Sequence, residues 1–153
     1  MRFPYLVLPT SRPIPSLTQA TVRHRPIVPV RISGPTGSWL MDCSLDCGTD
    51  DTIFPRWLAD KLGVDLTNAE AGEARPIGTS SVPYCYAKVA LRLTDGQEVC
   101  EWEAVVGFVT VPLRWPILGH AGFLQFFDVE LLGQRQEVKI RPNPSFPGWR
   151  GRR

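Results

Sequence analysis

The chain has 153 residues, of which 43% are apolar and 21% are charged. This length and composition suit one folded domain and exclude an intrinsically disordered chain. No run of about 18 apolar residues occurs, so neither a membrane-spanning helix nor a membrane partner is predicted. The apolar start is short and broken by proline, unlike a secretory signal peptide, and we therefore expect a cytoplasmic protein.

The balance of 17 Lys and Arg against 15 Asp and Glu gives a net charge of +2. The basic excess lies in the C-terminal tail, since residues 141–153 hold four arginines and no acid. Such a tail could touch nucleic acid, but its prolines are more typical of a solvated end, so no nucleic-acid partner is expected. We predict an arm over residues 1–25, a folded domain over 26–141 and a disordered basic tail over 142–153.

The first predicted elements of the folded domain are two strands. Fifteen prolines and thirteen glycines favour short strands and turns over long helices. Residues 26–33 and 38–45 are predicted to be strands joined by a turn at residues 34–37. Pro26 and Pro29 lack the N–H that a central strand donates, so we expect the first strand to lie at a sheet edge.

A short helix is predicted next, over residues 55–62. Pro55 suits the first position of a helix and Gly63 suits its end. A second short helix is predicted over residues 120–127.

The strongest strand signal is the alternation of apolar and polar residues over residues 84–93. Asp95-Gly96 is a typical hairpin turn, and the returning strand alternates as well. A last hairpin is predicted from residues 128–132 and 137–141 around Gly133. Many short strands with one or two short helices indicate a mainly β protein, a small closed β-barrel or folded sheet.

The four cysteines are predicted to be free thiols, because no export signal accompanies them. They are Cys43, Cys47, Cys85 and Cys100. Their spacing matches no familiar zinc pattern, so we expect small buried side chains, no metal site and no cofactor.

One segment points to chemistry: residues 45–55 read Leu-Asp-Cys-Gly-Thr-Asp-Asp-Thr-Ile-Phe-Pro. Asp46 follows an apolar strand, where a carboxylate is costly to bury unless it is paired or hydrogen-bonded. Gly48 lets the backbone bend close beneath that carboxylate. The alternative is a plain turn in which Asp46 caps its own backbone, and these few residues alone favour that turn.

The longer string resembles the active-site segment of retropepsin-like aspartic proteases, in which Asp-Thr/Ser-Gly is followed by Asp-Asp-Thr and apolar residues. A second signature of that family, two apolar residues and a glycine, matches Ile117-Leu118-Gly119. The resemblance covers residues 26–141 and implies a flap near residues 76–84, around Gly78.

The resemblance implies a retropepsin-like barrel and a homodimeric aspartic endopeptidase, whose two Asp46 carboxylates activate a water against a peptide or protein substrate. Cys47, Gly48 and Thr49 would support the active site, and Leu118 and Gly119 would be structural. Substrate binding is implied for Gly48, Asp50, Asp51, Gly78, Thr79 and Ile117.

Three positions depart from the family pattern. Cys47 replaces a Thr or Ser that bonds across the dimer axis, and a thiol is a weaker donor. Thr49 replaces a small residue, although its hydroxyl could take the place of a serine hydroxyl. His120 replaces an arginine that pairs with the acid matching Asp50, and the imidazole is mostly neutral at pH 7. A catalytically impaired dimerisation or peptide-binding module is therefore the alternative function, and a redox protein using Cys43 and Cys47 is a third.

Overall fold

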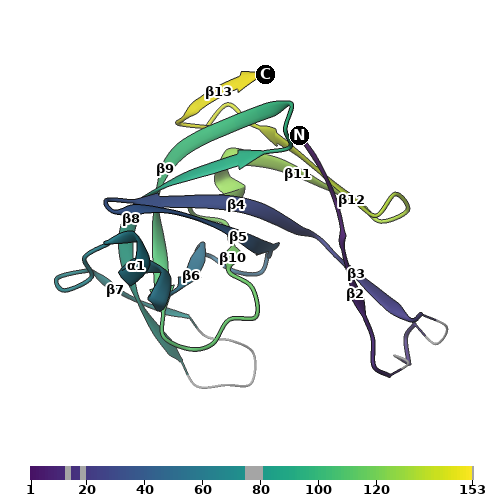
Figure 1. Ribbon diagram of the computed structural model, residues 1–153, viewed down its shortest axis with the longest axis horizontal. Coiled ribbons are helices and arrows are strands. Elements are labelled where there is room, and N and C mark those ends of the chain that lie inside the picture. Colours follow the sequence, from purple (N-terminus) through teal and green to yellow (C-terminus); the bar gives the residue numbers. More distant parts are fainter. Residues whose placement is uncertain (13–14, 18–19, 75–80, 153) are drawn as a thin grey trace.

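The protein is built around a closed six-stranded β-barrel, seen in the computed structural model that describes residues 1–12, 15–17, 20–74 and 81–152 (Figure 1). The barrel strands are β4 (Ile27–Gly34), β5 (Gly37–Leu45), β6 (Ile53–Pro55), β8 (Val82–Thr94), β9 (Glu98–Val109) and β10 (Ile117–Leu118). The ring runs β4-β5-β10-β6-β9-β8 and closes by the pairing of β8 with β4. The expectation of a mainly β protein with a small closed barrel is confirmed.

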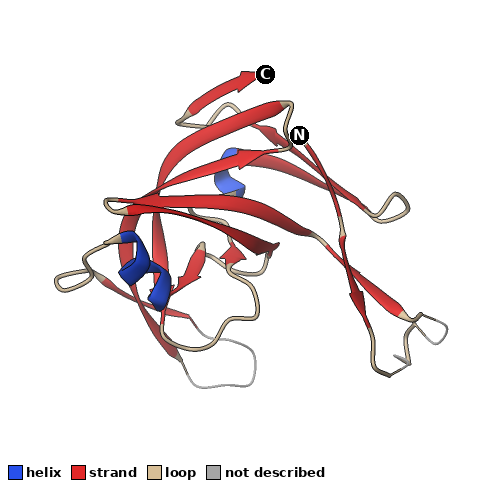
Figure 2. Cartoon of the chain, in the orientation of Figure 1, coloured by secondary structure: helices blue, strands red, loops and turns tan. Residues whose placement is uncertain are grey.

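Further strands extend from this barrel. Strand β7 (Ala71–Ala74) pairs with the start of β8, and β13 (Trp149–Arg152) pairs with the start of β9. A separate sheet has the order β1-β12-β11, from Arg2–Pro4, Glu137–Pro142 and Phe127–Leu132. Of the arm predicted over residues 1–25, β1 belongs to that sheet instead, with Phe3 buried. Strands β2 (Leu6–Pro9) and β3 (Val22–Arg25) form a two-stranded ribbon, from here on called the arm, which projects away from the barrel (Figures 1 and 2).

The core lies inside the barrel and continues beneath the β1-β12-β11 sheet. The alternation predicted over residues 84–93 and their partner strand places one face of β8 and β9 in this core, including Leu91, Leu93, Val106 and Phe108. Trp102 packs against Phe123 and Phe127, and its indole N–H donates to the Gly122 carbonyl at 3.0 Å. This cluster joins the barrel to the second sheet.

Helix α1 (Arg56–Leu62) forms where the sequence predicts it. Pro55 caps its start, and Gly63 ends it with φ of +68°, a left-handed conformation that glycine adopts without strain. Leu58 and Leu62 lie on one face of this helix and are buried in the core. Among the described residues, no helix has the length and apolar character needed to cross a membrane.

Two local predictions are wrong. Strand β4 is not at an edge: it lies between β5 and β8, and Pro29 is accommodated because the β8 ladder begins only at Val30. Residues 120–127 form no α-helix but a single 3-10 turn, Leu124–Phe126. The backbone of Ala121 pairs with Asp51 instead of entering a helix, and Gly122 has φ of +88°.

The C-terminal tail also differs from the expected disordered end. Residues 149–152 form β13, in which Arg150 opposes Cys100 and Arg152 opposes Glu98. Arg152 forms an ion pair with Glu98 at 3.5 Å. A free edge of β9 is therefore covered by a strand whose charge the sheet partly compensates.

Candidate active site

Asp46 lies at the point where β5 leaves the barrel, held there by a strand from far along the chain. Strand β10 runs parallel to the end of β5 and antiparallel to β6, so it lies between the two ends of the loop that carries Asp46. The Asp46 backbone N–H donates to the Leu118 carbonyl at 3.2 Å. The carboxylate is thus attached to a closed sheet, which fixes a side chain better than a free loop does.

Both carboxylate oxygens of Asp46 accept hydrogen bonds from the following turn. The Gly48 backbone N–H donates to Oδ1 at 2.9 Å, and the Thr49 hydroxyl donates to Oδ2 at 2.9 Å. This is the geometry of an aspartate that caps its own turn, as the plain-turn alternative requires. It also leaves a half-buried carboxylate in a fixed orientation, so the turn and a catalytic role are compatible.

The loop after Asp46 is fastened to the segment that follows β10. The backbone N–H groups of His120 and Ala121 donate to the carbonyls of Thr49 and Asp50, at 2.9 and 2.7 Å. Gly119 makes this approach possible, because a Cβ there would lie 2.2 Å from the Asp51 carbonyl oxygen. The two signatures of the sequence, 46–53 and 117–119, therefore meet through backbone contacts.

A pair of tyrosines holds the carboxylate of Asp51. The hydroxyls of Tyr84 and Tyr86 both donate to Asp51 Oδ2, the second at 2.9 Å, and the two hydroxyls lie 3.1 Å apart. Both tyrosines belong to β8, the strand that continues from the β7–β8 hairpin. This tyrosine clamp, Tyr84 and Tyr86 on Asp51, therefore connects that hairpin to the Asp46 loop.

The Tyr84 ring is seated between two glycines. A Cβ on Gly72 of β7 or Gly107 of β9 would come within 2.5 or 2.6 Å of the ring. The residue is 5% exposed. Burial, followed by the hydrogen bond to Asp51, raises the pKa of Tyr84 above its ordinary value, so the phenol stays a donor across the neutral range.

A groove of about 630 Å³ runs past Asp46. Its described lining comprises Asp46, Gly48, Thr49, Asp50, Asp51, Ile53, Glu73, Ala74, Tyr84 and Ile117. Four of these are carboxylates and none is a cation. The volume is in the range of small-ligand sites, and the position between the loop and the β7–β8 hairpin gives the groove two distinct walls.

Most residues that the sequence singles out lie together at this groove, and the exceptions are informative. Cys47 is exposed and does not line it. The imidazole of His120 is exposed and forms no ion pair with Asp50 among the described contacts. Leu118 and Gly119 act through their backbone. Gly78 and Thr79, with most of the expected flap, lie outside the described residues.

Other predictions for the cysteines are met in part. Cys43 and Cys100 are buried, and burial raises the pKa of both thiols, as expected of small core side chains. Cys85 is half-buried.

Sequence reasoning missed the tyrosine clamp and Glu73. The signal for the tyrosines was present, since Tyr84 and Tyr86 are two apart on a strand and share a face. What the sequence did not show is that this face meets Asp51, more than thirty residues earlier.

The arrangement supplies one Asp46 carboxylate per chain, oriented by its own turn and lining a groove of about 630 Å³. A single carboxylate cannot act as base toward a water and as acid toward a carbonyl in the same step. No protein-family model and no curated protein sequence matches the chain.

Proposed function

We propose that the protein is an aspartic endopeptidase of the retropepsin-like type, active as a homodimer with one Asp46 from each chain. The observation that carries the proposal is the position of Asp46. It leaves barrel strand β5, is bonded to β10 and has a donor on each carboxylate oxygen at the floor of the groove. Residues of both sequence signatures line this one groove, which supports the same proposed function.

In the proposed reaction, two Asp46 carboxyl groups about 3 Å apart share one proton, because like charges at that distance do not both ionise. The ionised carboxylate removes a proton from a water, whose oxygen attacks the scissile carbonyl carbon. The protonated carboxyl of the partner donates to the carbonyl oxygen. The resulting diol collapses as the C–N bond breaks, and the amine leaves with a proton from the site.

The substrate in this proposal is an extended peptide lying in the groove as an added strand. The main-chain carbonyl of Gly48 and the exposed carboxylate of Asp50 are available to bind its backbone. The β7–β8 hairpin forms the opposite wall, and the tyrosine clamp fixes the base of that wall to the loop.

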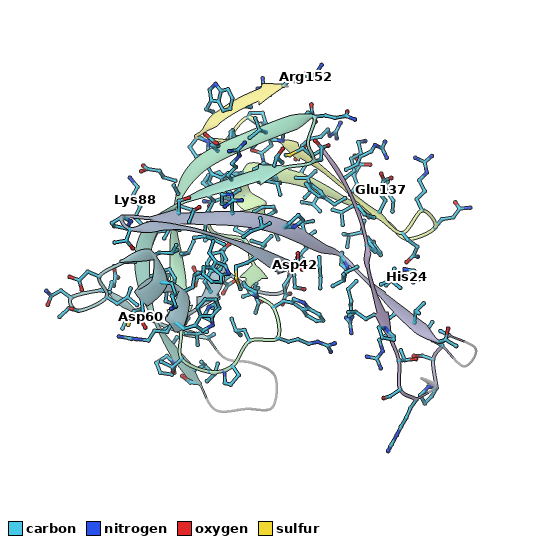
Figure 3. All side chains as sticks on the ribbon, in the orientation of Figure 1. His24, Asp42, Asp60, Lys88, Glu137 and Arg152 are labelled. Carbon is cyan, nitrogen blue, oxygen red and sulfur yellow. The ribbon has the colours of Figure 1, made fainter. Side chains whose placement is uncertain are left out.

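The deciding experiment is digestion of a peptide library between pH 4 and 7, followed by mass spectrometry. Asp46→Asn is expected to reduce cleavage by at least a thousandfold, because a neutral amide cannot act as the base. The matched control is Asp42→Asn, which removes an exposed carboxylate from β5, the strand that precedes Asp46 (Figure 3), and is expected to leave cleavage within twofold. Cleavage that survives Asp46→Asn refutes the assignment.

A non-catalytic, peptide-binding module is the second candidate. It is favoured by the two hydrogen bonds that Asp46 already accepts from its own turn and by the exposed thiol of Cys47, at the position where the family carries a hydroxyl. This alternative predicts binding of library peptides without cleavage, measured by retention on the immobilised protein, and equal retention by Asp46→Asn.

A further inference from the structure

A second cleft, of about 410 Å³, is lined by four arginines and lies at the arm. Arg23 and Arg25 come from β3, Arg12 from the segment after β2, and Arg114 from the loop between β9 and β10. Residues distant in sequence thus bring their guanidinium groups to one place. The remaining lining residues are Leu8, Pro9, Thr10, Ser11 and Pro15, so the described lining contains no acid.

The register of the arm explains why two of these side chains converge. Arg23 and Arg25 oppose Leu8 and Leu6 across the ribbon and, two residues apart on a strand, share a face. His24 opposes Val7 and points to the other face, on the side away from the barrel (Figure 3). Strand periodicity therefore explains why Arg23 and Arg25 face the same cleft.

These four arginines differ from the arginines that face carboxylates elsewhere. Arg2 bonds Glu137 at 2.7 Å, and Arg141 and Arg152 have glutamate partners within 3.5 Å. Among the described residues, none of the four cleft guanidinium groups has an ion pair or hydrogen bond, although Arg114 stacks 4.3 Å from the Trp115 ring centre. One exposed unpaired arginine is ordinary, but four in one cleft repel one another unless an anion joins them.

The sequence around the arm also lacks any internal counter-charge. Residues 1–41 contain five arginines and no Asp or Glu, whereas residues 42–74 contain eight acids and two bases. Three of these five arginines, Arg12, Arg23 and Arg25, belong to the arm and its connecting segment, whereas Arg152 of the C-terminal tail is paired within the sheet.

We propose that this arginine cleft binds a ligand that carries two or more adjacent phosphate groups. Guanidinium groups bind phosphate oxygens in a planar, bidentate fashion, and four of them match the three or four negative charges of such a group. The hydroxyls of Thr10 and Ser11 are further donors at the cleft. The cleft has the volume of a small-molecule site, and its described lining has no aromatic ring on which a nucleic-acid base would stack. The proposal is independent of the peptidase activity.

Isothermal titration calorimetry with inorganic tripolyphosphate, pyrophosphate and monophosphate tests it on the full chain. Affinity is expected to rise from monophosphate to tripolyphosphate and to fall as salt is added. Arg23→Gln and Arg25→Gln are each expected to weaken tripolyphosphate binding about tenfold, or about 1.4 kcal/mol. Arg114→Gln repeats the test from a different segment of the chain.

The control is Arg135→Gln, which removes the same charge from an exposed arginine in the β11–β12 turn, outside the cleft. It is expected to change binding by less than twofold, and unchanged thermal unfolding shows that each variant is folded. The proposal is overturned by absence of binding at millimolar tripolyphosphate. It is also overturned by equal losses in Arg135→Gln, or by citrate binding as tightly as tripolyphosphate, which would make the cleft a general anion site.

Discussion

The acidic groove and the arginine cleft carry opposite charges, and they differ in how those charges are held. In the groove, Asp46 and Asp51 each accept two hydrogen bonds from neighbouring donors. In the cleft, Arg23 and Arg25 have no such partner among the described residues. A charged side chain that is held by fixed donors keeps one geometry, which a catalytic group requires. A charged side chain without a partner is instead available to bind a ligand. The contrast predicts that substitutions will perturb the two sites very differently.

The largest expected effect is at the rigid site, from Gly119→Ala. A Cβ there would lie 2.2 Å from the Asp51 carbonyl oxygen and 2.8 Å from that of Thr49, and both are backbone atoms in a closed network. We expect the free energy of unfolding to fall by about 2–3 kcal/mol. Urea denaturation followed by tryptophan fluorescence measures it. The control is Gly133→Ala, where a Cβ meets nothing within 4 Å; equal losses in both variants would contradict the close approach.

The next largest effect is expected at the tyrosine clamp and is tested by Tyr84→Phe. Removing the hydroxyl leaves the Asp51 carboxylate with Tyr86 as its donor, so the free energy of unfolding should fall by about 1–2 kcal/mol at pH 7. Tyr86→Phe should cost less, because that residue is less buried. A loss that is larger in Tyr86→Phe would show that the clamp is not organised around Tyr84.

The clamp also gives the unfolding free energy a pH dependence. The pKa of Tyr84 is raised in the folded protein, so above pH about 10 the unfolded chain releases a proton that the folded chain retains. Stability from this group is complete below that pH and is lost as the pH rises further. Denaturation curves between pH 9 and 11 should show a shallower decline in Tyr84→Phe than in the unaltered protein; parallel declines would exclude the effect.

A smaller, functional effect is expected from Cys47→Thr, the position that separates the two candidate functions. A hydroxyl is a stronger donor than a thiol, so pairing of two chains should tighten by about tenfold if this residue lies at a dimer axis. Sedimentation equilibrium measures the change, with Cys85→Ser as the control for loss of a thiol. An unchanged association constant would place Cys47 away from any symmetry axis.

The smallest effect is expected in the cleft. Because Arg25 has no carboxylate partner among the described residues, Arg25→Gln should leave the free energy of unfolding within about 0.5 kcal/mol or raise it slightly. Arg2→Gln, which breaks the 2.7 Å contact with Glu137, should instead lower it by up to about 1 kcal/mol. Thermal unfolding of both variants without added phosphate makes the comparison, and a larger loss in Arg25→Gln would reveal an internal partner.

The features that the sequence predicted well depend on neighbours in the chain. Apolar alternation in β8 and β9, the Asp95-Gly96 turn and the ends of α1 are local signals, and all three are confirmed. The prediction that Gly48 brings the backbone beneath the Asp46 carboxylate is of the same kind.

The features that it missed depend on contacts between distant segments. Pro29 suggested an edge strand. The proline does not show that β8 pairs with β4 only from Val30 onward, which leaves Pro29 outside that pairing. The backbone of residues 120–121 is used by the Asp46 loop, which prevents a helix there. The tyrosine clamp, the arginine cleft and the pairing of β13 likewise join residues that the sequence separates widely. Retropepsin-like ancestry, dimerisation and the roles of Gly78 and Thr79 remain predictions.

The two-residue strand β10 has a consequence for the order in which the molecule is made. It completes the ring between β5 and β6, and its residues are synthesised about seventy positions after Asp46. Closing the chain over such a separation costs conformational entropy before the contacts that it creates can stabilise the fold. We therefore expect this part of the barrel to form late. A nascent chain on the ribosome therefore carries the Asp46 carboxylate without its supporting backbone until residue 121 has emerged. The backbone that holds the Asp46 loop in place is therefore the last part of this region to be completed.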